Sequence, residues 1–389
     1  MSFLLIYVIF VLFLIISLII CYRKGIYYWI IPYTIFYVRN SRRKEIENPI
    51  DIFLCIADHF EPGYGDASIE KQRQRVDRWV FDCPKLAKKH CDIDGYPPKH
   101  TWFFPPHYDI DKHLEKLVLL CIQGLGEIEL HFHHNRVEPF PDTAETFEKK
   151  IQNCINSFSR FNIFSKDSTG KSRFGFIHGD WALDNSRGDK FCGINNELEI
   201  LSRLGCYADF TFPALYESQP KLLNRIFYAK DNPLKPKSYN TGREVAVGSK
   251  DYGDLLIIQG ILGIRFLKRI NSFFMAIEDS SISNANPPTE KRIDYWINNG
   301  ISIKGRSHVK FIKLHTHGAW EGSMESLLGR AADNMHSYLE SKYNDGKNYR
   351  LHYVTAREMY NIIKGLEIGM EENPVDYRDF LVSKPNYTL

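Results

Sequence analysis

Strand-length apolar runs that end in histidine or aspartate recur along this chain, and they constrain its fold more than any other feature. From residue 50 onward they alternate with longer segments of helical character. This alternation is typical of a parallel sheet, because each parallel connection has to cross the sheet before the next strand begins. The predicted strands cover residues 50–57, 100–104, 126–135, 173–177, 207–212, 254–261, 309–314 and 350–354. The predicted helices cover residues 109–123, 143–158, 195–204, 291–299, 323–343 and 356–364, and residues 216–252 are expected to form a long surface loop.

Polar side chains gather where these strands end. One histidine at a strand end is an ordinary core residue, but recurrence at five strand ends indicates a functional site. In β/α barrels the carboxyl ends of the strands form the rim on which active sites are built. We therefore expect an α/β fold, a distorted (β/α)7-8 barrel, with a site at this rim formed from Asp58, His59, His107, His131, His133, His178, Asp180, His315 and His317.

The stretch 126–135 shows the pattern most clearly. Ile128, Leu130 and Phe132 alternate with polar residues, so His131 and His133 share one face of the predicted strand. Two imidazoles spaced in this way commonly hold a divalent metal ion. A histidine-rich surface turn is the simpler alternative for an isolated pair of this kind.

The N-terminal region predicts a membrane anchor. Residues 3–22 are uncharged and apolar, with the length of about 20 residues that a helix needs to cross a bilayer. Residues 26–38 are too short to span and are expected to lie at the membrane interface, with a first helix of the globular domain as the alternative. We therefore divide the chain into an anchor, 1–44, and a barrel, 45–389. Basic residues follow the apolar run and none precede it, which favours a single-pass protein with a cytoplasmic domain.

Composition excludes some classes of partner. The net charge of +3 and the lack of a long basic run argue against nucleic-acid binding. The eight cysteines include no Cys-x-x-Cys pair, and several lie in apolar runs, so reduced core cysteines are expected.

Three segments in this order resemble the polysaccharide deacetylase (NodB-homology, carbohydrate esterase family 4-like) superfamily. Residues 56–62, with Asp58 and His59, stand where that family has an Asp-Asp pair. Residues 127–131 are similar to its histidine motif, and Leu314-His315 is similar to its late Leu-His motif. The resemblance covers roughly residues 50–364. Its Arg-Pro segment is replaced here by His178-Gly179-Asp180-Trp181.

The resemblance implies a barrel of the glycoside hydrolase/deacetylase type and a site with assigned roles. Asp58 would be the general base and His315 the general acid, while His59 and His131 would be metal ligands. The family's second histidine position holds Asn135, so His133 or His134 would complete the site, and strand alternation favours His133. The expected cofactor is a divalent metal, with Zn²⁺ as the first choice.

The implied activity is removal of an acetyl group from an N-acetylated sugar of a glycan or lipid-linked precursor. Such a metal would activate water and polarise the amide carbonyl, and an acid would protonate the departing amine. Two alternatives stay open. One is another metal-dependent barrel hydrolase, of the amidohydrolase or phosphoesterase kind. The other is a catalytically inactive barrel that binds a glycan.

Overall fold

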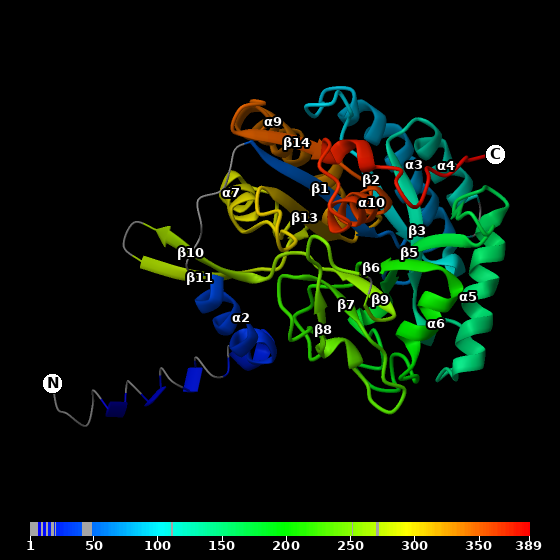
Figure 1. Cartoon of the computed structure of the whole chain (residues 1–389), viewed down its shortest axis with the longest axis horizontal. Helices are drawn as coiled ribbons and strands as arrows, with labels where there is room; N and C mark the ends of the chain where they lie inside the picture. Colours follow the sequence, from blue (N-terminus) through cyan, green and yellow to red (C-terminus); the bar gives the residue numbers. More distant parts are fainter. Residues whose placement is uncertain are drawn as a thin grey trace.

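The computed structural model describes residues 7–8, 11–12, 15–16, 19, 21–40 and 49–389, apart from 110–111, 251 and 270–271. Its centre is one large sheet whose strands are mostly parallel (Figure 1). The strands of this parallel part, in spatial order, are β12 (Ser281–Ile282), β13 (Val309–Thr316), β1 (Ile50–His59), β2 (His100–Phe104), β3 (Gly126–Phe132), β5 (Ser172–His178), β6 (Cys206–Asp209) and β9 (Leu255–Ile258).

Shorter strands extend this sheet. β7 (Ile226–Ala229) and β8 (Gly242–Glu244) add to β9 in antiparallel fashion, and they lie in the segment expected to be a long loop. β14 (Tyr349–Tyr353) pairs with the first half of β1, whereas β2 pairs with its last residues. β4 (Ser165–Lys166) pairs with β5. A separate hairpin of β10 (Gly263–Arg269) and β11 (Ser272–Glu278) extends from the body beside the N-terminal helix (Figure 1).

Helices connect the parallel strands, as the alternating pattern predicts. The helices among the described residues are α2 (Ile26–Asn40), which precedes β1, α3 (Ile69–Ala87), α4 (His113–Ile122), α5 (Ala144–Ser159), α6 (Glu197–Leu204), α7 (Glu290–Asn299), α8 (Glu321–Leu328), α9 (Arg330–Tyr343) and α10 (Ala356–Glu367), which follows β14. Capping boxes at Thr143 and Thr355 start α5 and α10, because each threonine satisfies a backbone N–H that has no helical partner. The single helix expected over 323–343 is two helices, since the backbone at Gly329 is extended.

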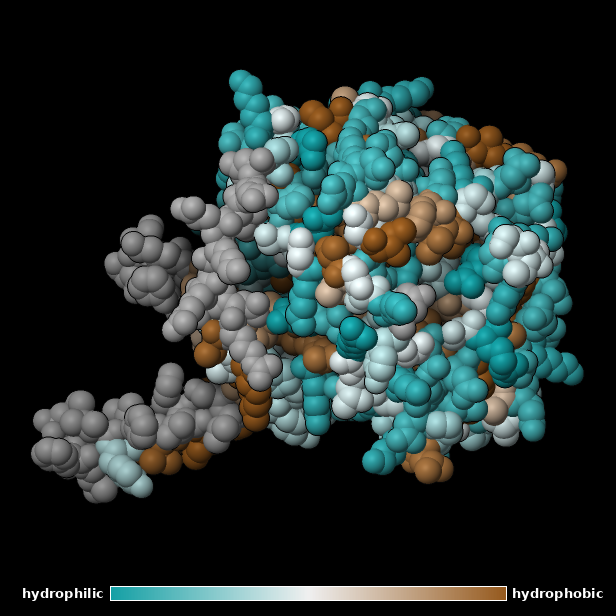
Figure 2. Space-filling view, viewed as in Figure 1, coloured by the Kyte–Doolittle hydropathy of each residue, from teal (hydrophilic) through white to brown (hydrophobic). Residues whose placement is uncertain are grey.

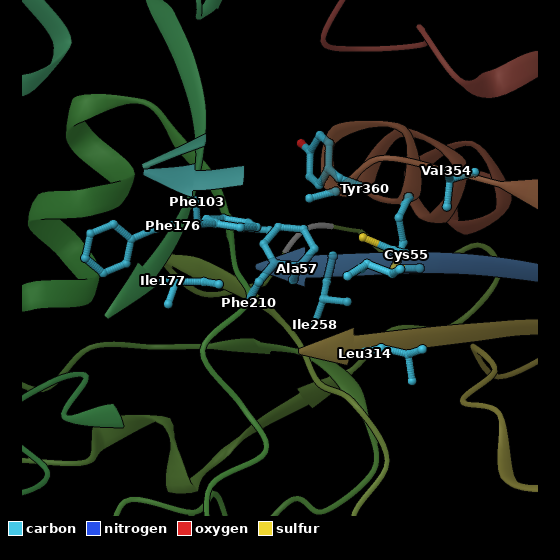
Figure 3. Close-up of a cluster of buried hydrophobic side chains, with 14 of the residues drawn as sticks. Cys55, Ala57, Phe103, Phe176, Ile177, Phe210, Ile258, Leu314, Val354 and Tyr360 are labelled. Carbon is cyan, nitrogen blue, oxygen red and sulfur yellow. The ribbon is translucent and has the colours of Figure 1, made fainter. Parts of the chain in front are cut away.

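The core lies between this sheet and the helices around it. Figure 3 shows part of it, where Ala57 of β1, Phe103 of β2 and Phe176 of β5 lie near Tyr360 of α10. These side chains are fully or almost fully buried. Burial of such apolar surface is the main favourable contribution to folding, and it holds the strand ends in place.

The α/β class is confirmed, but the sheet does not close into a barrel in the described part of the chain. Its hydrogen-bonded order runs from β12 to β8, and these two outer strands are not paired. Lys313 of β13 donates from Nζ to the carbonyl oxygens of Phe210 and Phe212, at 2.6 and 2.5 Å. A buried side chain therefore bridges β13 and the segment after β6.

The structure contradicts the predicted membrane anchor. Residues 3–22 are described only in part, and among the described residues we find no helix with the length and apolar character needed to cross a bilayer. The apolar segment that follows forms α2, which has 15 residues and contains Pro32. The single-pass anchor and the membrane localisation derived from it are therefore corrected, and the cytoplasmic orientation loses its basis.

One face of the segment 26–38 packs on protein, whereas Ile31, Ile35 and Val38 are exposed, and the interfacial position stays a prediction. Trp29 of α2 is fully buried against Leu223 and Leu262. Figure 2 shows apolar side chains gathered where this helix meets the body of the molecule. The alternative of a first helix of the globular domain describes this contact better.

Candidate metal centre

The carboxyl ends of three strands bring histidines and one carboxylate together. His59 ends β1, His131 lies in β3 with His133 just beyond it, and His317 follows β13. Glu61 stands two residues after His59, in the loop that leaves β1. Parallel pairing places these strand ends at one edge of the sheet, so residues far apart in sequence become neighbours.

Glu61, His131 and His133 form the centre of this arrangement. The Nε2 atoms of the two histidines lie 3.1 Å apart, and His133 Nε2 lies 3.0 Å from Glu61 Oε1. His131 Nε2 is 3.9 Å from the same oxygen. One ligand atom from each of the three residues lies within 4.8 Å of the others. Imidazole nitrogen and carboxylate oxygen at this spacing are the donors that zinc and related ions use.

Two further histidines border the centre. The His59 ring lies 4.9 Å from the rings of both His131 and His317, centroid to centroid. His59 Nε2 is buried and has no hydrogen-bond partner. His317 Nε2 lies 3.8 Å from Glu61 Oε2. A buried polar atom without a partner costs free energy. A ligand bound at His59 Nε2 would remove this cost.

Backbone and carboxylate groups orient the two central rings. His131 Nδ1 lies 3.0 Å from the carbonyl oxygen of Ile177, and His133 Nδ1 lies 3.1 Å from Asp180 Oδ2. Each contact leaves the corresponding Nε2 facing the centre. Such contacts by the remaining ring nitrogen are typical of metal-binding histidines, because they select the tautomer.

The loop after β5 is shaped around His133. A Cβ added at Gly179 would lie 2.3 Å from His133 Nδ1, so only glycine fits there. The next two residues, Asp180 and Trp181, have φ angles of 56° and 51°. Residues other than glycine rarely adopt this left-handed backbone conformation, and such backbone strain is concentrated at functional sites.

The pKa values of the side chains in the centre differ strongly from their ordinary values. Burial lowers the pKa of His131 to about 3 and holds that of His59 well below its usual value. Burial opposes ionisation of Glu61, but the hydrogen bond from His133 and the charges of the neighbouring histidines together outweigh it and bring the pKa of Glu61 to about 2. His133, between Glu61 and Asp180, has its pKa raised to about 9 against the effect of burial. His131, His59 and Glu61 are thus in the protonation states that a cation binds, whereas His133 has to release a proton when a metal binds.

The centre opens into a pocket of about 470 Å³. Its wall is rich in aromatic side chains, and its other charged residues are Asp66, Asp180 and Arg136. The lining residues are His59, Glu61, Gly63, Tyr64, Gly65, Asp66, Tyr108, His131, His133, Arg136, Asp180, Trp181, Tyr216 and His317. The donor set and the unpartnered His59 Nε2 fit a divalent metal, and the pocket gives a substrate access to it.

The structure places Asp58 and His315 away from the positions expected of a base and an acid. Asp58 is fully buried; its Oδ2 lies 2.8 Å from His100 Nε2, and its Oδ1 accepts from the Gly318 amide at 2.6 Å. It is not among the residues that line the pocket. His315 is buried, and its ring lies 6.3 Å from that of His59. It lines a neighbouring cavity together with Trp181 and His317.

The remaining candidates divide between the two sides of β3. His133 lies with His131, as strand alternation predicts, whereas His134 turns to the opposite side and lies beside His178. His107 lies at the edge of the centre, with its ring 6.2 Å from that of His133. Burial lowers the pKa of His107 to about 4.

Sequence reasoning did not select Glu61. The sequence pattern that could have indicated Glu61 is its spacing from His59. Residues two apart in an extended segment point to the same side, so Glu61 is expected beside His59. Pro62 and Gly63 follow directly, and we assigned the whole segment to a loop.

Comparison with protein-family models, with curated proteins and with solved structures finds no match for this chain. The resemblance of its motifs to the polysaccharide deacetylases stays a prediction.

Proposed function

We propose that this protein is a metal-dependent hydrolase that removes an acetyl group from an N-acetylated sugar. The observation that supports it best is the convergence of Glu61, His131 and His133, next to a His59 Nε2 that has no partner. Glu61, His131 and His133 would hold the metal, with Zn²⁺ as the first choice, and a position would stay open for water. When bound, the metal would supply a Lewis acid for the amide carbonyl and lower the pKa of water.

His317 is the residue we assign to proton transfer. It lines the pocket and lies at the border of the metal centre, with Nε2 3.8 Å from Glu61 Oε2. In the proposed reaction, His317 Nε2 accepts a proton from the attacking water. It then delivers that proton to the amide nitrogen as the C–N bond breaks, which yields acetate and a free amine.

Asp58 supports His317 in this proposal and does not act as the base. Its Oδ1 accepts from the amide of Gly318, the residue next to His317, and its Oδ2 is paired with His100. Asp180 in turn orients His133. Both carboxylates are positioning residues, since each acts through a neighbouring group.

The pocket wall favours a ring-shaped substrate. Trp181, Tyr64, Tyr108 and Tyr216 line it, and flat aromatic faces pack well against the apolar face of a sugar ring. Arg136, also in the wall, supplies hydrogen-bond donors for hydroxyl or carbonyl oxygens.

Metal content and product release test the proposal together. The full chain is loaded with Zn²⁺ and incubated with N-acetylated oligosaccharides, and acetate and free amine are measured beside His131→Ala and His317→Ala. We expect acetate release from the wild type, loss of bound metal and activity in His131→Ala, and loss of activity with metal retained in His317→Ala. Release of phosphate from phosphoesters without acetate release would favour a phosphoesterase, and a metal-free, inactive wild type would favour a glycan-binding protein.

A further inference from the structure

A second group of metal-binding side chains lies on the opposite side of β3. It consists of His134, His178, Cys192 and Glu197, and every one of them is fully buried. His134 lies just beyond β3, His178 ends β5, Cys192 is in the loop that follows, and Glu197 begins α6. One ligand atom from each lies within 4.8 Å of all the others.

The two histidines present the same ring nitrogen to the centre of this group. His134 Nδ1 lies 2.8 Å from Asp142 Oδ2, and His178 Nδ1 lies 2.5 Å from the carbonyl oxygen of Gly179. Since a carbonyl oxygen accepts, the Nδ1 of His178 is the protonated nitrogen, and its Nε2 has a lone pair. Both Nε2 atoms face Glu197 Oε1, at 3.1 and 3.4 Å.

Cys192 completes the group on its remaining side. Its Sγ lies 3.9 Å from His134 Nε2 and 3.7 Å from Glu197 Oε2. In a tetrahedral zinc site with Zn–N near 2.0 Å and Zn–S near 2.3 Å, neighbouring ligand atoms are roughly 3.3–3.7 Å apart. The observed separations, from 3.1 to 3.9 Å, bracket that spacing and require only small shifts of the side chains to meet it.

An unpartnered atom and the local charge both indicate a missing ligand. His178 Nε2 is buried and makes no hydrogen bond. Asp142 is matched by Lys150, whose Nζ lies 2.8 Å from Asp142 Oδ1. The Glu197 carboxylate and a Cys192 thiolate would together balance one divalent cation, so the loaded group would be neutral, as burial requires.

We propose that His134, His178, Cys192 and Glu197 form a structural zinc site, separate from the pocket and independent of the proposed activity. Four protein ligands leave no open position, and the group is closed to solvent, so the ion has no catalytic role here. It would fasten the loop over residues 179–196 to the ends of β3 and β5. A network of hydrogen bonds without metal is the competing interpretation.

Cysteine distinguishes the two centres spectroscopically. The pocket centre, formed by His59, Glu61, His131 and His133, has no sulfur ligand, whereas the buried group contains Cys192. The full-length protein is stripped of zinc, loaded with Co²⁺, and its near-ultraviolet spectrum is recorded. We expect a thiolate-to-cobalt charge-transfer band in the wild type, the same band in His131→Ala, and no band in Cys192→Ser. Cys154→Ser, which removes a buried cysteine of α5, is the matched control and should keep the band.

Elemental analysis of the zinc-loaded proteins gives the second readout. We expect about two equivalents in the wild type, about one in Cys192→Ser and about one in His131→Ala. A wild type with one equivalent that Cys192→Ser loses and His131→Ala keeps would support the buried site while it refutes the pocket centre. A cobalt-loaded wild type without the charge-transfer band would overturn the structural zinc site, and this result needs no variant to fold.

Discussion

The Nε2 atoms of His131 and His133 lie 3.1 Å apart at the wall of an aromatic pocket. Two imidazole nitrogens this close face each other favourably when a proton or a metal ion lies between them. Glu61 beside both of them adds the negative charge that favours a divalent cation.

Asp180→Asn tests how far the orientation of His133 determines metal binding. Asparagine keeps the size of the side chain and removes the charge that faces His133 Nδ1. We expect metal affinity to fall by roughly 10–100-fold, as is typical when the partner of a ligating histidine is lost. Competition with a chelator measures the affinity. Asp189→Asn, an exposed residue of the same loop, should bind metal as the wild type does; equal affinities in both variants would contradict the role of Asp180.

Gly179→Ala tests the close approach of the loop to His133. The new Cβ would lie 2.3 Å from His133 Nδ1, so the imidazole has to move and its contact with Asp180 is lost. We expect a loss of bound metal close to that of His133→Ala. In a His133→Ala background the same glycine substitution should have little further effect on metal content, because the obstructed ring is gone. Additive losses in the double variant would show that Gly179 acts elsewhere.

Arg357→Met tests the buried ion pair that joins α10 to β3. Arg357 donates from Nε and Nη2 to Glu127, and both side chains are almost fully buried. Removing the guanidinium leaves a buried carboxylate unpaired, so the free energy of unfolding should fall by about 3–5 kcal/mol. Chemical denaturation measures it. Arg203→Met, which breaks an exposed pair with Glu148, should change stability little; similar losses in both variants would refute the distinction.

His336 predicts part of the acid sensitivity of the fold. Burial, helped by the nearby His90, lowers the pKa of His336 from 6.5 to about 3. The unfolded chain therefore binds a proton at this residue below about pH 6.5, while the folded chain stays neutral there down to about pH 3. The contribution of neutral His336 to the free energy of unfolding is therefore fully present above pH 6.5. It is lost as the pH falls towards 3, by roughly 1 kcal/mol per pH unit.

Denaturation curves between pH 7 and pH 4 check this prediction. His336→Gln, which cannot take up the proton, should lose less stability over that interval than the wild type. Parallel curves for the two proteins would show that His336 is protonated in the folded state as readily as in the unfolded chain.

Local patterns predicted most of the strands. β2 and β3 follow from alternation and apolar runs, and the pairing of His131 with His133 follows from the same period. The prediction omitted α3, whose sequence begins with mostly charged and polar residues and contains Pro84. It also omitted the β10–β11 hairpin, because its strands pair with each other and not with the main sheet.

Partners that are distant in the chain account for the other differences. Asp58 lies at the carboxyl end of β1, where catalytic aspartates are common, but His100 at the start of β2 pairs with it, and no local pattern indicates that contact. Lys313 meets two carbonyl groups that are about a hundred residues away along the chain, and no local pattern indicates these contacts either. The contact of Glu61 with His133, just beyond β3, likewise joins segments that are far apart in the sequence.

The alternation of side chains after β3 has a consequence for protein engineering. His131 and His133 face the pocket, whereas His134 faces the buried group on the other side. Inserting or deleting one residue between Phe132 and His134 would therefore change both centres in a single step. Libraries that vary substrate preference should keep this spacing constant and draw their diversity from the aromatic wall of the pocket.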